Sequence, residues 1–150
     1  METMKVLVVD DEPGIRTGVI RVLRGFTLLV PEIGKQVQFD IAQAESAEQA
    51  LETIQSNQPH ILLLDNKLPG ISGLELLERI VSMNLDMLTI MITAYASIET
   101  AVRATKQGAY DFLPKPFTPA ELKNTVRKAA EHRMVALHAK ELAAEKRKVR

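Results

Sequence analysis

Several apolar runs of this chain end in side chains that suit phosphoryl chemistry. They are Asp10 and Asp11 after residues 6–9, Asp65 after 61–64, Thr93 after 88–92 and Lys115 after 112–114. Taken alone, Asp65 could merely cap the turn at Pro69-Gly70, and the lysine and threonine could be ordinary surface and strand residues. Open α/β sheets collect functional groups at the carboxyl ends of their strands, so the whole set predicts one site with Asp65 as a phosphoryl acceptor.

Longer motifs surround these positions. They are Val8-Val9-Asp10-Asp11-Glu12, Leu64-Asp65 with Leu68-Pro69-Gly70 and Gly73, Thr93-Ala94, and Gly108-Ala109-Tyr110-Asp111-Phe112-Leu113-Pro114-Lys115-Pro116-Phe117. In this order the motifs resemble the receiver domain of bacterial two-component response regulators, and chance recurrence of the ordered set on another fold is improbable. Thr93-Ala94-Tyr95-Ala96 and the Lys-Pro-Phe ending are most similar to receivers of sigma-54 enhancer-binding activators of the nitrogen-regulation type.

The chain alternates short β-branched runs with helical patterns five times, which is typical of an α/β fold built from βαβ units. We predict strands at about 4–9, 37–42, 61–64, 88–92 and 110–113, and helices at about 13–24, 47–57, 72–83, 98–107 and from 119 onward. Capping boxes of Ser46 with Gln49 and Thr118 with Glu121 mark two helix starts. The resemblance implies a doubly wound, flavodoxin-like parallel sheet of five strands in the order 2-1-3-4-5.

Two stretches depart from this plan. An insertion at about 24–38 precedes the second predicted strand and is too apolar for an idle loop. It could lengthen the first helix, pack locally or offer a partner surface, and local packing is favoured. Residues 134–150 contain no Gly or Pro, so the last helix should continue through them. We therefore predict a receiver domain at 1–133 and a helical extension or linker at 134–150.

The three aspartates at the strand ends predict a metal site. Carboxylates brought together at neutral pH repel one another, so Asp10, Asp11 and Asp65 need shifted pKa values or a cation. A site of oxygen ligands with room for water favours Mg²⁺, for which Mn²⁺ could substitute. The resemblance implies that Asp11 and Asp65 bind the ion directly, that the Lys67 backbone carbonyl is a third ligand, and that Asp10 acts largely through water.

The same residues suit phosphoryl transfer, which needs a positioned nucleophile and neutralisation of charge. Asp65 can attack the phosphorus of a phosphohistidine, while the Lys115 ammonium and the Thr93 hydroxyl contact the phosphoryl oxygens. Such a chain would catalyse only its own phosphorylation and dephosphorylation.

The resemblance carries further expectations about the phosphorylated state. A sensor histidine kinase is the implied partner, and Thr93 with Phe112 would form the conformational switch. The Lys115-Pro116 peptide should be cis. Lys67 and Tyr95 flank the phosphorylation site and are both large, so we expect slow self-dephosphorylation.

Two rival functions remain open at this stage. A metal-dependent phosphohydrolase with an aspartyl nucleophile would usually carry a second acid where this chain has Lys67, and no cap domain is present to enclose a substrate. A phosphorylation-independent interaction module is the second rival, although every residue that the chemistry requires is present.

The composition limits the partners. Nineteen acidic and nineteen basic side chains cancel, so these residues are not expected to bind nucleic acid directly. No run approaches the length of a membrane helix, and the absence of cysteine fits a reducing cytoplasm, where we place the protein. Since there is no helix-turn-helix or Walker motif, an AAA+ or DNA-binding output domain, or both, would lie outside this chain. We also expect a homodimer.

Overall fold

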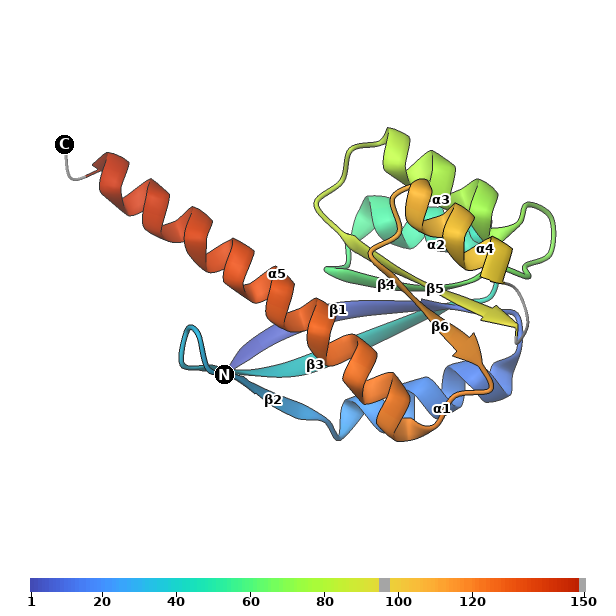
Figure 1. Ribbon diagram of the computed structural model, residues 1–150, viewed down its shortest axis with the longest axis horizontal. Helices are drawn as coiled ribbons and strands as arrows, with labels where there is room; N and C mark the ends of the chain where they lie inside the picture. The colour runs from blue at the N-terminus through green and yellow to red at the C-terminus, as the bar shows by residue number, and fades with distance from the viewer. Residues whose placement is uncertain (95–97, 149–150) are drawn as a thin grey trace.

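The computed structural model describes residues 1–94 and 98–148 and shows a twisted sheet with helices on both faces (Figure 1). The strands are β1 Glu2–Val9, β2 Thr27–Val30, β3 Lys35–Ala44, β4 Ile61–Asp65, β5 Leu88–Ala94 and β6 Asp111–Lys115. The helices are α1 Pro13–Arg24, α2 Ala47–Ser56, α3 Gly73–Ser82, α4 Ile98–Lys106 and α5 Pro119–Lys148. Helices α1 and α5 cover one face of the sheet, and α2, α3 and α4 cover the other, so two apolar cores form.

The five predicted parallel strands are confirmed in their predicted order, which reads β3-β1-β4-β5-β6 in the labels of the structure. The central strand β4 is buried along its whole length, which explains why its sequence is a continuous apolar run instead of an alternating one. The prediction of a five-stranded, wholly parallel sheet was incomplete. A sixth strand, β2, extends the edge beside β3 and makes the sheet mixed.

The additional strand is the insertion. Helix α1 ends at Arg24 as predicted, and β2 then pairs antiparallel with the first half of β3 through a turn in which Gly34 has a φ of 65°. Leu28 and Val30 point into the core, and the Phe26 ring stacks on Phe39 with 5.7 Å between ring centroids. Local packing of the insertion is therefore confirmed, and lengthening of the first helix was wrong.

Side-chain caps fix where the helices begin. Thr118 and Glu121 form the predicted reciprocal capping box at α5, with hydrogen bonds of 3.1 Å in each direction. Ser46 Oγ accepts a hydrogen bond from the Gln49 backbone N–H at α2. An equivalent cap at α3, Ser72 with the Glu75 backbone N–H, was not predicted. These caps set the helix starts beside the carboxyl ends of the strands.

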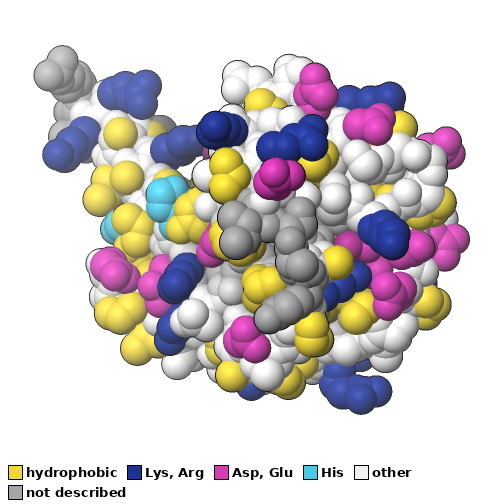
Figure 2. Space-filling view, turned by 45° about the vertical axis from the view of Figure 1, so that its right-hand side comes forward, with side chains coloured by type: hydrophobic (Ala, Val, Ile, Leu, Met, Phe, Trp, Pro, Cys, Tyr) yellow, Lys and Arg dark blue, Asp and Glu magenta, His cyan; other side chains and the backbone are white. Residues whose placement is uncertain are grey.

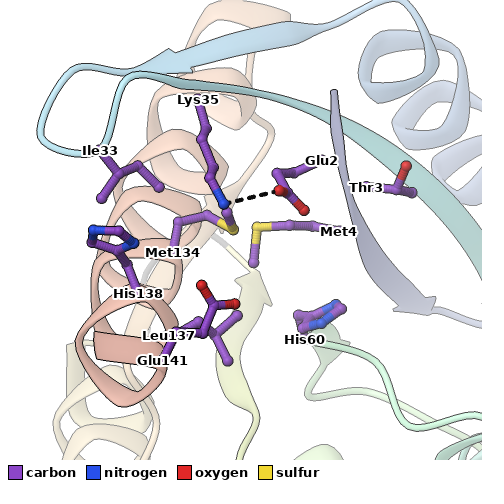
Figure 3. A pocket seen from close by; sticks show the side chains of 10 residues that line it. All are labelled: Glu2, Thr3, Met4, Ile33, Lys35, His60, Met134, Leu137, His138 and Glu141. Atoms are coloured by element: carbon purple, nitrogen blue, oxygen red, sulfur yellow. Dashed lines mark ion pairs between the residues drawn. The ribbon is translucent and has the colours of Figure 1, made fainter. Parts of the chain in front are cut away.

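Helix α5 continues beyond the sheet, as predicted, and its first extended turns are held against the body (Figure 1). Buried Arg133 makes two hydrogen bonds of 2.8 Å to the Asp86 carboxylate, and Lys140 Nζ lies 2.8 Å from the same group. A cavity of about 90 Å³ beneath this segment is lined by Met134 and Leu137 of α5 and by Met4 and Ile33 of the body. Figure 3 shows the Met134 and Met4 side chains pointing toward each other. The helix is thus anchored to the body as far as Lys140.

The anchor predicts a measurable loss of helix stability in Asp86→Ala. The change leaves the buried Arg133 guanidinium without its carboxylate, so amide hydrogen exchange in residues 134–141 should accelerate by about fivefold or more, for a lost contribution of ~1 kcal/mol. Asp40→Ala, which removes an exposed carboxylate from β3, should leave exchange there unchanged. Equal protection in both variants would show that apolar packing alone holds the helix.

Candidate functional site

The carboxyl ends of four parallel strands surround an open depression of about 630 Å³. Strands β4, β5 and β6 end at Asp65, Ala94 and Lys115, and the chain leaves β1 just before Asp10. The lining residues are Asp11, Glu12, Asp65, Asn66, Lys67, Thr93, Ala94, Thr100 and Lys115. The structure therefore brings the predicted reactive side chains to one place, with Asp10 buried completely beside them.

The Lys115 ammonium is the charge centre of this depression. Its Nζ atom lies 2.8 Å from Asp10 Oδ2 and 3.4 Å from Asp65 Oδ2. Glu12 is a more exposed neighbour at 3.7 Å. The lysine side chain is only 17 % exposed, so water screens these attractions weakly. The Lys115-Pro116 peptide bond, which directly follows this lysine, is cis as predicted.

The pKa of Asp65 is raised although a lysine ammonium lies beside it. Burial, and next the charge of Asp10, raise the pKa of Asp65 to about 6, although Lys115 and the Lys67 backbone N–H oppose the rise. Burial alone would lower the pKa of Lys115, but its hydrogen bond to Asp10 and the charge of Asp65 raise it. The lysine therefore stays positively charged at neutral pH, and the pKa of Asp65 lies about one unit below neutral pH.

The donor groups fit a divalent cation such as Mg²⁺. Carboxylate oxygens of Asp10, Asp11 and Glu12 lie within 4.8 Å of one another, and all are the hard oxygen donors that this ion prefers. Asp10 Oδ1 accepts the Glu12 backbone N–H at 2.9 Å, while the buried Oδ2 lies 2.8 Å from the lysine ammonium. Asp65 lines the same depression. A further positive charge would compensate this unbalanced cluster.

Hydrogen bonds of Asn66 hold the turn after β4 in place. The Asn66 N–H donates to Ile92 O at 3.0 Å, and Asn66 O and Oδ1 accept from the Gly73 and Leu74 N–H groups at 2.8 and 3.2 Å. Helix α3 consequently begins directly against the turn after β4. A Cβ atom on Gly73 would lie 2.3 Å from the Asp65 carbonyl oxygen, so only glycine allows this approach.

The predicted switch residues lie on neighbouring strands. Thr93 is 3 % exposed in β5, whereas Phe112 in β6 is 43 % exposed and points away from the core. The pairing of β5 with β6 sets Phe112 beside Met91, so the aromatic is two residues from the threonine along the sheet. The ring centroid of Tyr110, which precedes β6, lies 5.2 Å from that of His132. Tyr95, predicted to flank the phosphoryl group, lies outside the described residues.

Sequence reasoning missed two residues of the depression. Glu12 was noted only as part of a motif, yet its carboxylate joins both the acidic cluster and the lysine. Thr100 lines the depression from the first turns of α4. Thr100 could have been found because it lies near the start of the helix that follows a parallel strand, and such helix starts lie at the carboxyl edge of the sheet.

Comparisons with known proteins agree with this geometry. The family model described as the response regulator receiver domain matches residues 6–127. The chain is 34% identical over 133 residues to the C4-dicarboxylate transport transcriptional regulatory protein DctD of Pseudomonas aeruginosa, covering 89% of this chain and 26% of that protein. It is 35% identical over 127 residues to the DNA-binding transcriptional regulator NtrC of Escherichia coli, covering 85% of this chain and 25% of that protein.

A solved structure supports the same relationship. The crystal structure of NtrX from Brucella abortus superposes with a TM-score of 0.78 at 33% sequence identity, over 95% of this chain and 30% of that one. The chain thus spans about a quarter of the length of the first curated relatives. Within residues 1–94 and 98–148, no helix combines the length and apolar composition needed to cross a bilayer.

Gly73→Ala should destabilise the fold through the contact with the turn after β4. The added methyl group must displace the backbone of Asp65 and Asn66, with a cost of ~2 kcal/mol or more. Gly18→Ala in α1 is the matched control, because nothing lies within 4 Å of its added Cβ and alanine favours the helix by ~0.5–1 kcal/mol. Urea unfolding measures both variants, and equal stability of the two would refute the close approach.

The pKa of Asp65 predicts that Asp65→Asn stabilises the metal-free protein. A folded-state pKa of about 6 exceeds the ordinary 3.8, so stability is lost as pH rises through this interval, and the loss is complete above it. In EDTA, the variant should melt about 4 °C or more above the wild type at pH 7.5. The gain should be smaller at pH 5, and Asp40→Asn should show none. A variant that melts below the wild type at pH 7.5 would contradict the electrostatic account.

Proposed function

Because the chain belongs to the response regulator receiver domain family, we propose that Asp65 accepts a phosphoryl group from the phosphohistidine of a sensor histidine kinase. Receiver domains are phosphoacceptor modules of two-component systems, and the relatives of this chain include sigma-54 activators. The observation that carries the assignment is a carboxylate, 3 % exposed, that lines an open depression 3.4 Å from a lysine ammonium.

The proposed transfer uses the ionised form of Asp65. One carboxylate oxygen attacks the phosphorus, the P–N bond of the phosphohistidine breaks, and the electron pair of that bond returns to the imidazole. The product is an acyl phosphate on Asp65. Lys115 keeps its ion pair with Asp10 and directs its remaining N–H groups to the phosphoryl oxygens. The chain acts only on its own aspartate, so its chemistry is self-phosphorylation and self-dephosphorylation.

Asp10, Asp11 and Glu12 would hold Mg²⁺ or Mn²⁺ together with Asp65 and the Lys67 backbone carbonyl. When bound, the cation offsets the charge of the carboxylates and of the phosphoryl oxygens. Asp10 lies deepest, with no exposed surface, whereas Asp11 and Glu12 are open to solvent, which leaves room for water ligands.

The proposed signal is a rearrangement of Thr93 and Phe112. If the Thr93 hydroxyl moves toward the phosphoryl group, space opens beside β5 into which the outward Phe112 ring can turn. An aromatic ring with two stable positions converts a local change of charge into a change of the surface formed by α4, β6 and α5. That surface already exposes Val102, Tyr110 and Phe112.

We assign residues 1–133 to the receiver domain and 134–150 to a linker that leads to an output domain. Relatives about four times as long as the matched region support an AAA+ or DNA-binding output, or both, in the full protein. On the face drawn in Figure 2, basic and acidic side chains are intermixed over the body, while Lys and Arg gather on the projecting end of α5. The lack of cysteine fits a cytoplasmic location.

Asp65→Asn tests the assignment. With acetyl phosphate and Mg²⁺, the wild type should gain one phosphoryl group by intact-mass spectrometry, and the variant should gain none because an amide is not nucleophilic. Asp40→Asn is the control and should be labelled like the wild type. Undiminished labelling of Asp65→Asn would move the acceptor to another residue, and continuous release of phosphate without labelling would favour a phosphohydrolase.

Phosphorylation should favour a homodimer through α4, β6 and α5 or through the end of α5. Val135 and Leu142 are exposed on a helix that leaves the body, and such a helix gains most of its stability from packing. Sedimentation velocity with and without beryllofluoride measures the association. A chain truncated after Glu141 keeps the anchored turns but lacks the end of α5. Retained association of this truncated chain would exclude the end of α5 from the interface. Equal sedimentation in both states would exclude control of association by phosphorylation.

A further inference from the structure

The Arg16 side chain lies under the acidic loop and makes contacts that phosphoryl transfer does not require. Its Nη1 atom donates a hydrogen bond of 2.6 Å to the backbone carbonyl of Asp10, and its Nε atom donates one of 2.9 Å to Gln43 Oε1. The side chain is 12% exposed. One planar guanidinium group therefore connects the loop after β1 to the end of β3. Because its N–H groups are held in a rigid plane, the directions of both hydrogen bonds are fixed together.

These contacts act on the peptide that carries the deepest carboxylate of the cluster. The Asp10 backbone N–H donates to Ala44 O at 3.1 Å, so both backbone polar groups of Asp10 are bound on the β3 side. The Asp10 side chain then accepts the Glu12 N–H at 2.9 Å. The main-chain position of Asp10 consequently sets where its own carboxylate and the following Asp11 and Glu12 carboxylates can point.

The charge of Arg16 is partly compensated by a carboxylate that does not belong to the acidic cluster. Glu45 Oε2 lies 3.9 Å from Arg16 Nη2, and its side chain is 61% exposed. A bare guanidinium beside a cation site would repel the ion, whereas this pairing reduces the repulsion. The arrangement keeps the hydrogen bonds of the arginine and limits its electrostatic cost.

We propose that Arg16 is a positioning residue for the divalent-cation site, acting through the Asp10 peptide with Gln43 as its anchor. Arg16 does not touch the ion or the phosphoryl group. It holds the Asp10-Asp11-Glu12 loop in the arrangement in which the carboxylates converge, so less ordering is required when the cation binds. This inference rests on the proposed function, since it concerns the cation that assists phosphoryl transfer.

Geometry and charge predict opposite effects when Arg16 is replaced. Removal of a positive charge near the site, by itself, would tighten cation binding. Loss of the fixed Asp10 peptide would weaken it, because the loop would have to be ordered at the moment of binding. The direction of the change in affinity therefore separates a positioning role from a purely electrostatic one.

The experiment is a titration of the full 150-residue chain with Mn²⁺, in which electron paramagnetic resonance measures the concentration of free ion. Arg16→Ala should raise the Kd for Mn²⁺ by about tenfold or more. Arg16→Lys keeps the charge but cannot span both acceptors, so it should also raise the Kd. Arg21→Ala removes the same type of side chain from an exposed position of the same helix and should leave the Kd at the wild-type value.

The Gln43 anchor gives a second, milder test. Gln43→Ala should raise the Kd in the wild-type background and have little further effect in Arg16→Ala, because both changes break the same connection. Melting curves of each variant in EDTA accompany the titrations. Variants that melt at a lower temperature but retain the wild-type Kd would show that Arg16 is merely structural, and would overturn the proposal.

The remaining outcomes are also decisive. Tighter Mn²⁺ binding by Arg16→Ala would overturn the proposal in favour of simple charge repulsion. Absence of Mn²⁺ binding by the wild type would instead refute the cation site on which the proposal rests. A weakened Kd in Arg16→Ala and Arg16→Lys, with an unchanged Kd in Arg21→Ala, supports it.

Discussion

Two nearly buried carboxylates share one ammonium at the carboxyl edge of the sheet, and much of this structure depends on that imbalance. Asp10 and Asp65 lie within 3.4 Å of Lys115 Nζ, and neither carboxylate has more than a few per cent of its surface exposed. Burial of charge is costly unless it is paired, so the site favours a second positive charge. Burial, and next the charge of Asp10, raise the pKa of Asp65 in the same direction. A bound divalent cation would relieve the imbalance and leave Asp65 ionised as a nucleophile.

The fold keeps Asp10, Asp65 and Lys115 close together by fixing the backbone around them. The parallel strands deliver the side chains to one edge, and Gly73 allows α3 to begin against the Asp65 carbonyl. Arg16 holds the Asp10 peptide from below. Because these supports come from the backbone and from neutral or compensated groups, they do not themselves neutralise the carboxylates. The site keeps its affinity for a cation while its geometry is set in advance.

The sequence was most informative where local patterns and reactive residues coincide. Asp65 closes a continuous apolar run, and its place at the edge of the sheet was predicted from this run together with the other runs that end in reactive residues. The hairpin of the insertion was harder to predict, because β2 has only four residues and its partner is the extended start of β3. Contacts between positions far apart in the chain have no local pattern in the amino-acid sequence that could predict them. Asp86 meets Arg133 across 47 residues and Arg16 meets Gln43 across 27, and only the folded chain shows these pairs.

The most direct test of this account is the chemical identification of the phosphorylated residue. The protein is phosphorylated with acetyl phosphate and Mg²⁺, the acyl phosphate is reduced with borohydride, and the peptides are sequenced by mass spectrometry. Since an aspartyl phosphate is reduced to homoserine, the account predicts homoserine at position 65 and unmodified aspartate at positions 10 and 11. Homoserine at either of those two positions, or a phosphoryl group on a side chain that borohydride does not reduce, would contradict it.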